Sequence, residues 1–246
     1  MIRKATLFFG LIFCIVLFVA FTARNASSLV KGSLHDLTAV SGGGQFLYTG
    51  NANPCVFCHT PHHANSTNNG VTYLWNKTLP SQTFLTYSSD TLKTPVGAPG
   101  TLSLLCLSCH DGIGAFNVLL YYTGNPINPF GSHGNRFGDY NLADPNIGPL
   151  NIGGAYNCVG PTCSGGDDLR DDHPIGVNYD TAYADDNAGL HDFASLPSAV
   201  RIRLNLSSKR LECTTCHDPH LTNTTTTRNK FLVQATSTLC TGCHIK

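Results

Sequence analysis

Two stretches of the chain show a regular pattern of hydrophobic and polar residues. The first is an apolar run, Ala5–Ala23, which follows the basic residues Arg3 and Lys4 and precedes a polar stretch. A basic start, an apolar run and a polar end are typical of a secretory signal. We therefore predict a signal peptide over residues 1–26, with an uncleaved membrane anchor as the alternative. Residues 27–246 then form the exported domain.

The second pattern lies near residue 200. Apolar side chains alternate there with polar ones, at Val200, Ile202, Leu204 and Leu206. A period of two predicts a half-buried strand. Between residues 117 and 198 no periodicity is visible, and Gly, Asn, Pro and Asp are frequent. A loop-rich insert of this length is unusual in a compact domain unless something other than side chains supplies the core.

Composition adds little to this picture but excludes one class of function. The chain is 41% hydrophobic and 12% charged, and this charged fraction is about half the roughly 25% of ordinary soluble domains. We therefore expect long irregular segments and a weakly charged surface. The 15 basic and 15 acidic residues cancel. Because no stripe of Lys and Arg forms the basic surface that nucleic acid requires, a nucleic-acid-binding protein is excluded.

The cysteines carry the candidate chemistry. Eight of them form four copies of the pattern C-x-x-C-H, which is the attachment signature of c-type haem. Two thiols three positions apart can bond the two vinyl groups of one haem, while the adjacent imidazole binds the iron. The four motifs are Cys55, Cys58 and His59; Cys106, Cys109 and His110; Cys213, Cys216 and His217; and Cys240, Cys243 and His244. They predict four covalently attached haem c groups with iron.

Other uses of paired cysteines are less consistent with this pattern. Structural zinc, a redox disulfide and a disulfide staple all use CxxC pairs. Zinc would not require a histidine directly after the second cysteine every time, and a redox dithiol needs one motif rather than four. Cys158 and Cys163 remain, without a following histidine. We expect them to close a loop as a disulfide, with free thiols or a metal site as alternatives.

Each iron also needs a ligand on its other face. Met1 is the only methionine, whereas seven histidines lie outside the four motifs. The composition therefore predicts bis-His ligation, which gives six-coordinate, low-potential, electron-transferring haems without an open substrate position. This argues against catalysis at the iron and predicts that the protein is not an enzyme.

Two of the spare histidines stand three residues after a motif histidine. They are His62 and His220, each directly preceded by a proline that bends the chain out of a helix. A histidine so close cannot reach the opposite face of its own haem, so we expect each to serve a neighbouring iron. His63 competes with His62 for this role.

The other candidates are scattered along the chain. His173 is held extended by the proline that follows it, which suits a loop delivering one side chain. His35 is expected on a short helical turn. These two join His62 and His220 as the leading sixth ligands. His191 is a weaker candidate, and His133, among glycines, is better read as a solvent-exposed loop residue.

The motifs recur in one order, CxxCH-x-P-H and then LCxxCH, twice along the chain. This predicts one haem pair at residues 55–110 and another at residues 213–244, on either side of the insert at 117–198. We expect a mostly irregular, loop-rich multihaem cytochrome with short helices at the CxxCH sites, a few short strands and a core formed by the haems.

The residues also carry a family resemblance. The runs CVFCHTPHHA, YLWNK, TYSSDTL, SLLCLSCHDG, DDHPIGV, CTTCHDPH and LCTGCH resemble those of the doubled-CxxCH multihaem cytochromes of metal-reducing bacteria, above all the tetrahaem outer-surface (OmcE-like) filament family. The resemblance implies closely stacked haems, bis-His irons and polymerisation into extracellular filaments. In some members one subunit donates a sixth ligand to a haem of the next.

Together these features predict an exported electron carrier at the outer surface, in the extracellular space or in the periplasm. Its expected partners are redox proteins and further copies of itself, with no membrane association after signal cleavage. The low charge favours a polymerising conduit to external acceptors, since self-association buries surface. A soluble periplasmic electron shuttle is the main alternative. A multihaem reductase is disfavoured because every haem motif ends in histidine.

Overall fold

The computed structural model describes the chain in separate stretches, namely residues 30–31, 33, 35–36, 53–60, 73–111, 119–120, 168–170, 172–221 and 231–245. The predicted signal peptide and the predicted Cys158–Cys163 disulfide lie outside them. So do three of the spare histidines, His62, His63 and His133. Among the described residues no helix is long and apolar enough to cross a membrane.

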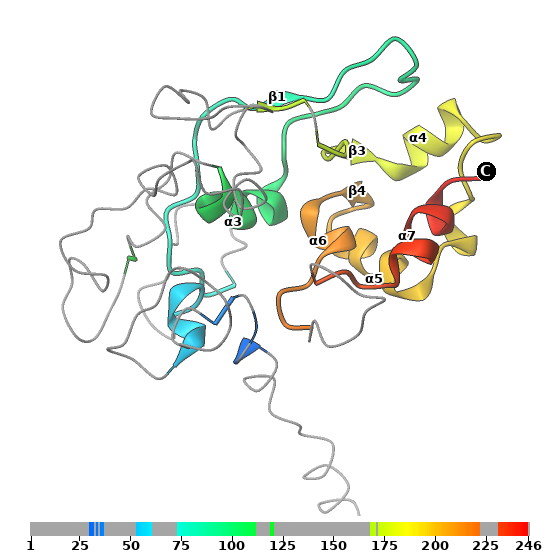
Figure 1. Ribbon diagram of the computed structural model, residues 1–246. Coiled ribbons are helices and arrows are strands. Elements are labelled where there is room, and N and C mark those ends of the chain that lie inside the picture. Colours follow the sequence, from blue (N-terminus) through cyan, green and yellow to red (C-terminus); the bar gives the residue numbers. More distant parts are fainter. Residues whose placement is uncertain are drawn as a thin grey trace, which may run out of the picture.

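Short helices and very short strands make up the described fold (Figure 1). In chain order they are η1 (Pro54–Phe57), β1 (Leu85–Thr86), α3 (Thr101–His110), β2 (Asp168–Leu169), β3 (Val177–Asn178), α4 (Tyr179–Asp185), η3 (Phe193–Ser195), α5 (Ser198–Leu206), β4 (Arg210–Leu211), α6 (Cys213–Cys216) and α7 (Thr236–Cys243). β1 pairs with β2 in parallel, and β3 pairs with β4 antiparallel. The strands therefore tie distant segments together without forming a layer.

The predicted strand near residue 200 is wrong, because these residues form helix α5. Val200 and Leu204 are 1% and 0% exposed, whereas Ile202 is 59% exposed. Burial thus recurs every four residues, which is the period of a helix face. Pro197 directly precedes the first helical residue, and its carbonyl accepts the N–H groups of Val200 and Arg201 at 3.0 and 2.9 Å. Lys209, in a left-handed conformation, donates its N–H to the Leu204 carbonyl and ends the helix.

Part of the insert at 117–198 is also helical, in α4 and η3. Asn178 starts α4 by accepting a hydrogen bond from the Thr181 N–H at 3.0 Å. Asp192 starts η3 by accepting from the N–H groups of Ala194 and Ser195 at 2.9 and 3.1 Å. Side-chain caps of this kind satisfy the free N–H groups of a helix start. They explain how helices form here without a long apolar period.

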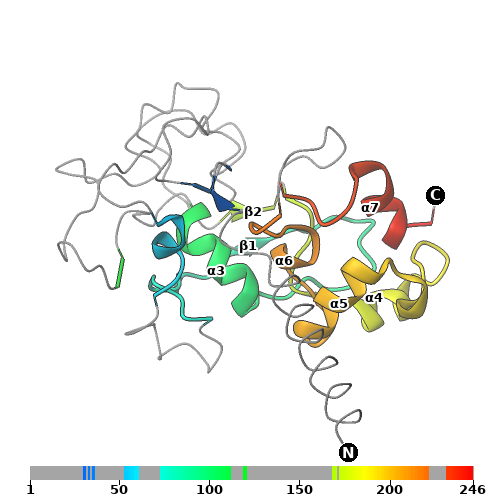
Figure 2. The ribbon, with the colours of Figure 1, turned by 90° about the horizontal axis from the view of Figure 1, so that it is seen from below.

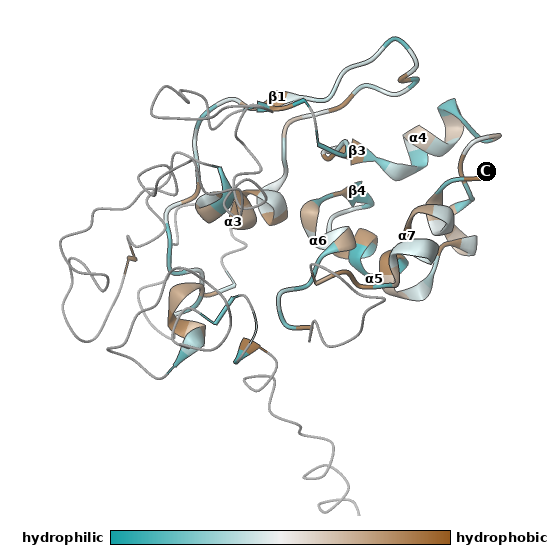
Figure 3. Ribbon diagram, viewed as in Figure 1, coloured by the Kyte–Doolittle hydropathy of each residue, from teal (hydrophilic) through white to brown (hydrophobic). Residues whose placement is uncertain are grey.

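Side chains form two small hydrophobic clusters in the described regions. The larger one joins α4, α5 and α7 through Tyr179, Leu196, Val200, Leu204, Val233 and Leu239. The smaller one consists of Phe84, Leu107 and Leu169 and packs around α3, which Figure 3 shows as largely hydrophobic. Between the two clusters, α3 and α6 lie side by side (Figure 1 and Figure 2).

Candidate haem-binding sites

All four CxxCH motifs contain a helical turn. Each lies on a helical turn, in η1, α3, α6 or α7. The N–H of the motif histidine donates to the carbonyl of the first cysteine, as from His59 to Cys55 at 2.8 Å and from His244 to Cys240 at 2.9 Å. Positions i, i+3 and i+4 of a helical turn lie on one face. The two thiols and the imidazole of each motif therefore face one side of the turn, as one haem requires.

The first and third motifs share more than their sequence. After the first motif, the chain returns so that Thr60 donates its N–H to the Leu74 carbonyl and Asn76 donates to the Cys58 carbonyl. His59 also forms an isolated antiparallel bridge with Trp75. Leu74 lies in the left-handed region, with φ at 56°.

The third motif repeats this arrangement bond for bond. Asp218 donates its N–H to the Phe231 carbonyl, Val233 donates to the Cys216 carbonyl, and His217 bridges Leu232. Phe231 takes the left-handed conformation of Leu74, with φ at 60°. The returning segment was missed from the sequence, because neither left-handed position is a glycine. The likeness of the first and third motifs therefore extends into the three-dimensional structure.

Three spare histidines lie opposite motif histidines. The ring centres of His59 and His220 are 6.1 Å apart, with an angle of 20° between the ring planes. His35 lies 6.1 Å from His110 at an angle of 75°. In the last motif, His173 lies 6.3 Å from His244 at 69°. Each pair joins segments that are far apart in the sequence.

These separations fit two imidazoles that share one metal. An imidazole nitrogen binds a transition metal at about 2 Å, so the ring centres of two imidazoles on opposite sides of one ion lie about 6 Å apart. The residues present therefore fit haem iron at three of the motifs. His191, a weaker candidate, lies beside the last motif, where its N–H donates to the Cys243 carbonyl at 2.9 Å.

In two of these rings, hydrogen bonds determine which of the two nitrogens is available to a metal. Nδ1 of His59 donates to the Tyr73 carbonyl at 2.8 Å, and Nδ1 of His173 donates to the Pro174 carbonyl at 3.1 Å. Carbonyl oxygens only accept, so Nδ1 must carry the proton in both rings. Nε2 is then left with the lone pair that a metal binds, as in most metal-ligating histidines.

His220 and His35 differ in their surroundings. Nδ1 of His220 lies 3.1 Å from Oδ1 of Asp218, and this hydrogen bond raises the pKa of the His220 ring and holds the pKa of the Asp218 carboxyl well below its usual range. Nδ1 of His35 is buried without a hydrogen-bond partner among the described residues. Burial, with nearby His110, His220 and His217, lowers the pKa of His35 to about 4. The ring is therefore neutral near pH 7, as a metal ligand must be.

Two of the motif thiols are poorly suited to disulfide exchange. Burial raises the pKa of both Cys58 and Cys216 to about 12. Thiolate is the reactive form in dithiol exchange, and a thiol with so high a pKa provides little of it. Among the described residues, all eight motif cysteines are outside disulfide bonds. At the first motif, the raised pKa of Cys58 disfavours the redox-dithiol alternative, whereas at the third a hydrogen bond with Cys106 lowers the pKa of Cys213.

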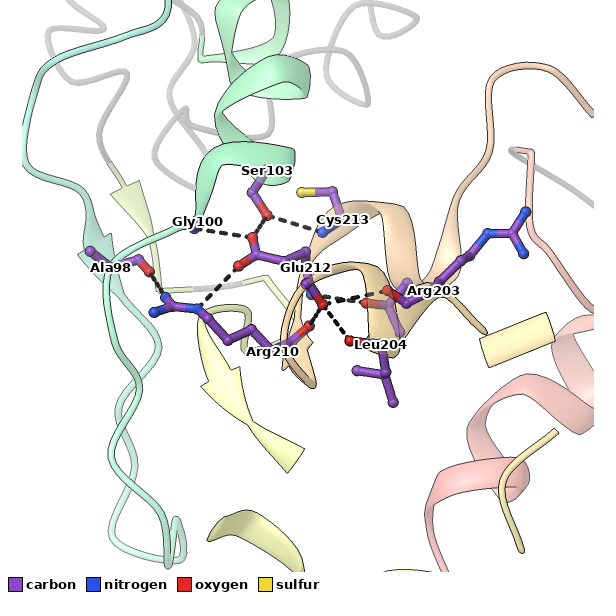
Figure 4. A network of polar contacts seen from close by, with 10 residues as sticks. Ala98, Gly100, Ser103, Arg203, Leu204, Arg210, Glu212 and Cys213 are labelled. Carbon is purple, nitrogen blue, oxygen red and sulfur yellow. Dashed lines mark hydrogen bonds and ion pairs between the residues drawn. The ribbon is translucent and has the colours of Figure 1, made fainter. Parts of the chain in front are cut away.

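One buried carboxylate joins the second motif to the third (Figure 4). Glu212 is 2% exposed and caps α6, where its side chain and that of Thr215 form a capping box. The same carboxylate accepts the N–H of Gly100 at 3.0 Å and the hydroxyl of Ser103, both at the start of α3. The Ser103 hydroxyl accepts in turn from the Cys213 N–H at 3.1 Å. The starts of both motif-bearing helices are thus held by one side chain.

Comparison with known families bears on the third and fourth motifs. A family model described as the doubled CXXCH motif matches residues 207–246, which contain the third and fourth motifs. No curated protein matches the chain. The family match supports a multihaem c-type cytochrome, in which the CXXCH residues bind haem c covalently through their cysteines and its iron through their histidine.

Proposed function

We propose that the chain is a tetrahaem c-type cytochrome that transfers electrons through bis-His haems. The observation that carries the proposal is the recurrence of a second imidazole about 6 Å from a motif imidazole at three separate motifs. Bound haem supplies one-electron redox chemistry at its iron. Two cysteines of each motif would attach one haem, and three pairs of histidines would each hold one iron: His59 with His220, His110 with His35, and His244 with His173.

We infer the sixth ligand of the third motif from the internal repeat. His62 stands in CHTPH where His220 stands in CHDPH, and the returning segments of the two motifs share their hydrogen bonds. Since His220 lies against the first motif, we assign His62 to the third, so that the two motifs exchange sixth ligands. His63 is the alternative. Replacing His62 by alanine should turn one haem high-spin, and the same result with His63→Ala alone would reassign the ligand.

Export to the outer surface, the extracellular space or the periplasm rests on the apolar run near the N-terminus. Filament formation rests on the low charge and on the resemblance to outer-surface filament cytochromes. Three of the proposed ligand pairs lie within one chain, so a ligand donated by another subunit would have to serve the third motif. Electron microscopy of the exported fraction tests this. Only discrete particles at high concentration would favour the soluble periplasmic shuttle.

Haem number and catalysis are tested separately. Mass spectrometry of the exported protein should show four covalently attached haems per chain, and a smaller number would contradict the tetrahaem proposal. With both axial positions filled by histidine, the iron has no site for substrate, so we propose that the protein is not an enzyme. Binding of carbon monoxide to the reduced native protein at any haem would instead favour the reductase alternative.

A further inference from the structure

The three spare histidines that face motif histidines differ in what their Nδ1 atoms contact. Nδ1 of His220 lies 3.1 Å from a carboxylate oxygen of Asp218. Nδ1 of His173 lies 3.1 Å from a neutral carbonyl oxygen, that of Pro174. Nδ1 of His35 has no hydrogen-bond partner among the described residues. Of these three Nδ1 atoms, that of His220 is the one whose described partner is a carboxylate.

Asp218 is held in place from several directions. Its Oδ1 accepts the backbone N–H of His220 at 3.0 Å as well as the ring N–H. Its Oδ2 accepts from Nη2 of Arg203 on α5 at 2.7 Å, in an ion pair whose side chains are 21% and 25% exposed. Its backbone N–H donates to the Phe231 carbonyl at 2.9 Å. Contacts other than the one with the His220 ring therefore hold the Asp218 carboxylate in place.

Arg203 is in turn anchored on its own helix. Its Nη1 donates to the Ala199 carbonyl at 3.1 Å, one turn earlier in α5. The helix packs into the larger hydrophobic cluster through Val200 and Leu204. The position of His220 at the first motif is thus coupled through Asp218 and Arg203 to the core of the C-terminal region.

The first half of the repeat lacks this arrangement. The residue that corresponds to Asp218 is Thr60, a neutral side chain that is 1% exposed. The sequence itself therefore offers a matched substitution, Asp218→Thr, which gives the third motif the side chain of the first.

A carboxylate that accepts the ring N–H of an iron ligand makes that imidazole a stronger donor and fixes its orientation. The stronger electron donation by the imidazole and the negative charge of the carboxylate both stabilise oxidised iron more than reduced iron. We propose that Asp218, clamped by Arg203, is a positioning residue that orients His220 and lowers the reduction potential of the haem held between His59 and His220. This inference rests on the proposed bis-His ligation and adds to it a residue that sets the potential of one haem.

The test is a potentiometric titration of the exported holoprotein, in which dithionite supplies one electron to each iron and no proton needs to leave His220. His220→Met identifies the transition that belongs to this haem, because methionine ligation raises the potential. Asp218→Asn and Asp218→Thr should shift that transition upward by at least tenfold in the equilibrium constant for reduction, about 59 mV for one electron. Asp218→Glu should restore most of the native value.

Asp180→Asn is the matched control. It also removes a carboxylate that pairs with a basic residue, Lys209 at 2.7 Å, but Asp180 contacts no candidate ligand. The proposal would be overturned if the Asp218 variants shifted every transition by the same amount as Asp180→Asn does. It would also be overturned if variants that keep four low-spin haems left the transition of the haem between His59 and His220 unchanged. If Asp218→Thr fails to mature, Asp218→Asn alone carries the test, because it keeps the size of the side chain and removes only its charge. A native protein without low-spin bis-His haems would instead refute the proposed function.

Discussion

The carboxylate of Glu212 makes the sharpest prediction about how the second and third motifs are held together. In Glu212→Gln, one carboxylate oxygen becomes an NH2 donor. If the NH2 group takes the place of Oε2, it faces the N–H of Gly100. If it takes the place of Oε1, it faces the guanidinium of Arg210, whose Nε lies 3.3 Å from Oε1 in the native protein. Either orientation of the amide leaves one donor directed at another donor.

The magnitude follows from burial. Glu212 is 2% exposed, so water cannot satisfy the misplaced donor, at a cost of about 1–3 kcal/mol. Loss of the charge weakens the remaining hydrogen bonds by about a further 1 kcal/mol. We therefore expect the free energy of unfolding to fall by about 2–4 kcal/mol. Denaturant titration of the holoprotein followed by circular dichroism measures it.

Asp180→Asn again provides the control, because Asp180 and Lys209 form an ion pair whose side chains are 55% and 35% exposed. Such surface pairs contribute less than about 1 kcal/mol. If Glu212→Gln cost no more than this control, the carboxylate would not be what holds α3 to α6.

The remaining predictions concern a helix, a ligand and a turn. Leu204→Ala should lower the free energy of unfolding by about 2–5 kcal/mol, whereas Ile202→Ala should change it by no more than about 0.5 kcal/mol. Equal losses in chemical denaturation would indicate the strand instead of α5. His173→Ala should convert one haem to high-spin in the electron paramagnetic resonance spectrum, and His191→Ala should convert none; the reverse result would exchange their roles. Gly176→Ala should cost roughly 1–3 kcal/mol in thermal unfolding, because Gly176 has φ at 80° and an added Cβ would lie 2.5 Å from a backbone oxygen. An unchanged melting temperature would contradict the geometry of this turn.

The sequence was sufficient for the chemistry of the motifs, because C-x-x-C-H is a local pattern whose residues share one face of a helical turn. It also supplied candidate partners, since Met1 cannot serve and the spare histidines can be counted. It could not say which histidine faces which motif. The contact between His59 and His220 depends on how two distant segments pack, and no local pattern encodes that packing.

The errors have local physical causes. Alternation over residues 200–206 fits a strand, but it also places Val200 and Leu204 four positions apart, on one face of a helix. The left-handed Leu74 and Phe231 are held by their hydrogen-bonded neighbours across the returning segment. Such conformations persist where the surrounding structure determines them, so the residue type gave no warning.

The central claim is that histidines occupy both axial positions of four covalently attached haems. Electron paramagnetic resonance of the fully oxidised exported protein tests it most directly, combined with a haem count on the same sample. We predict only low-spin signals, integrating to four irons per chain. A high-spin signal from even one full equivalent of iron in the native protein would contradict the claim.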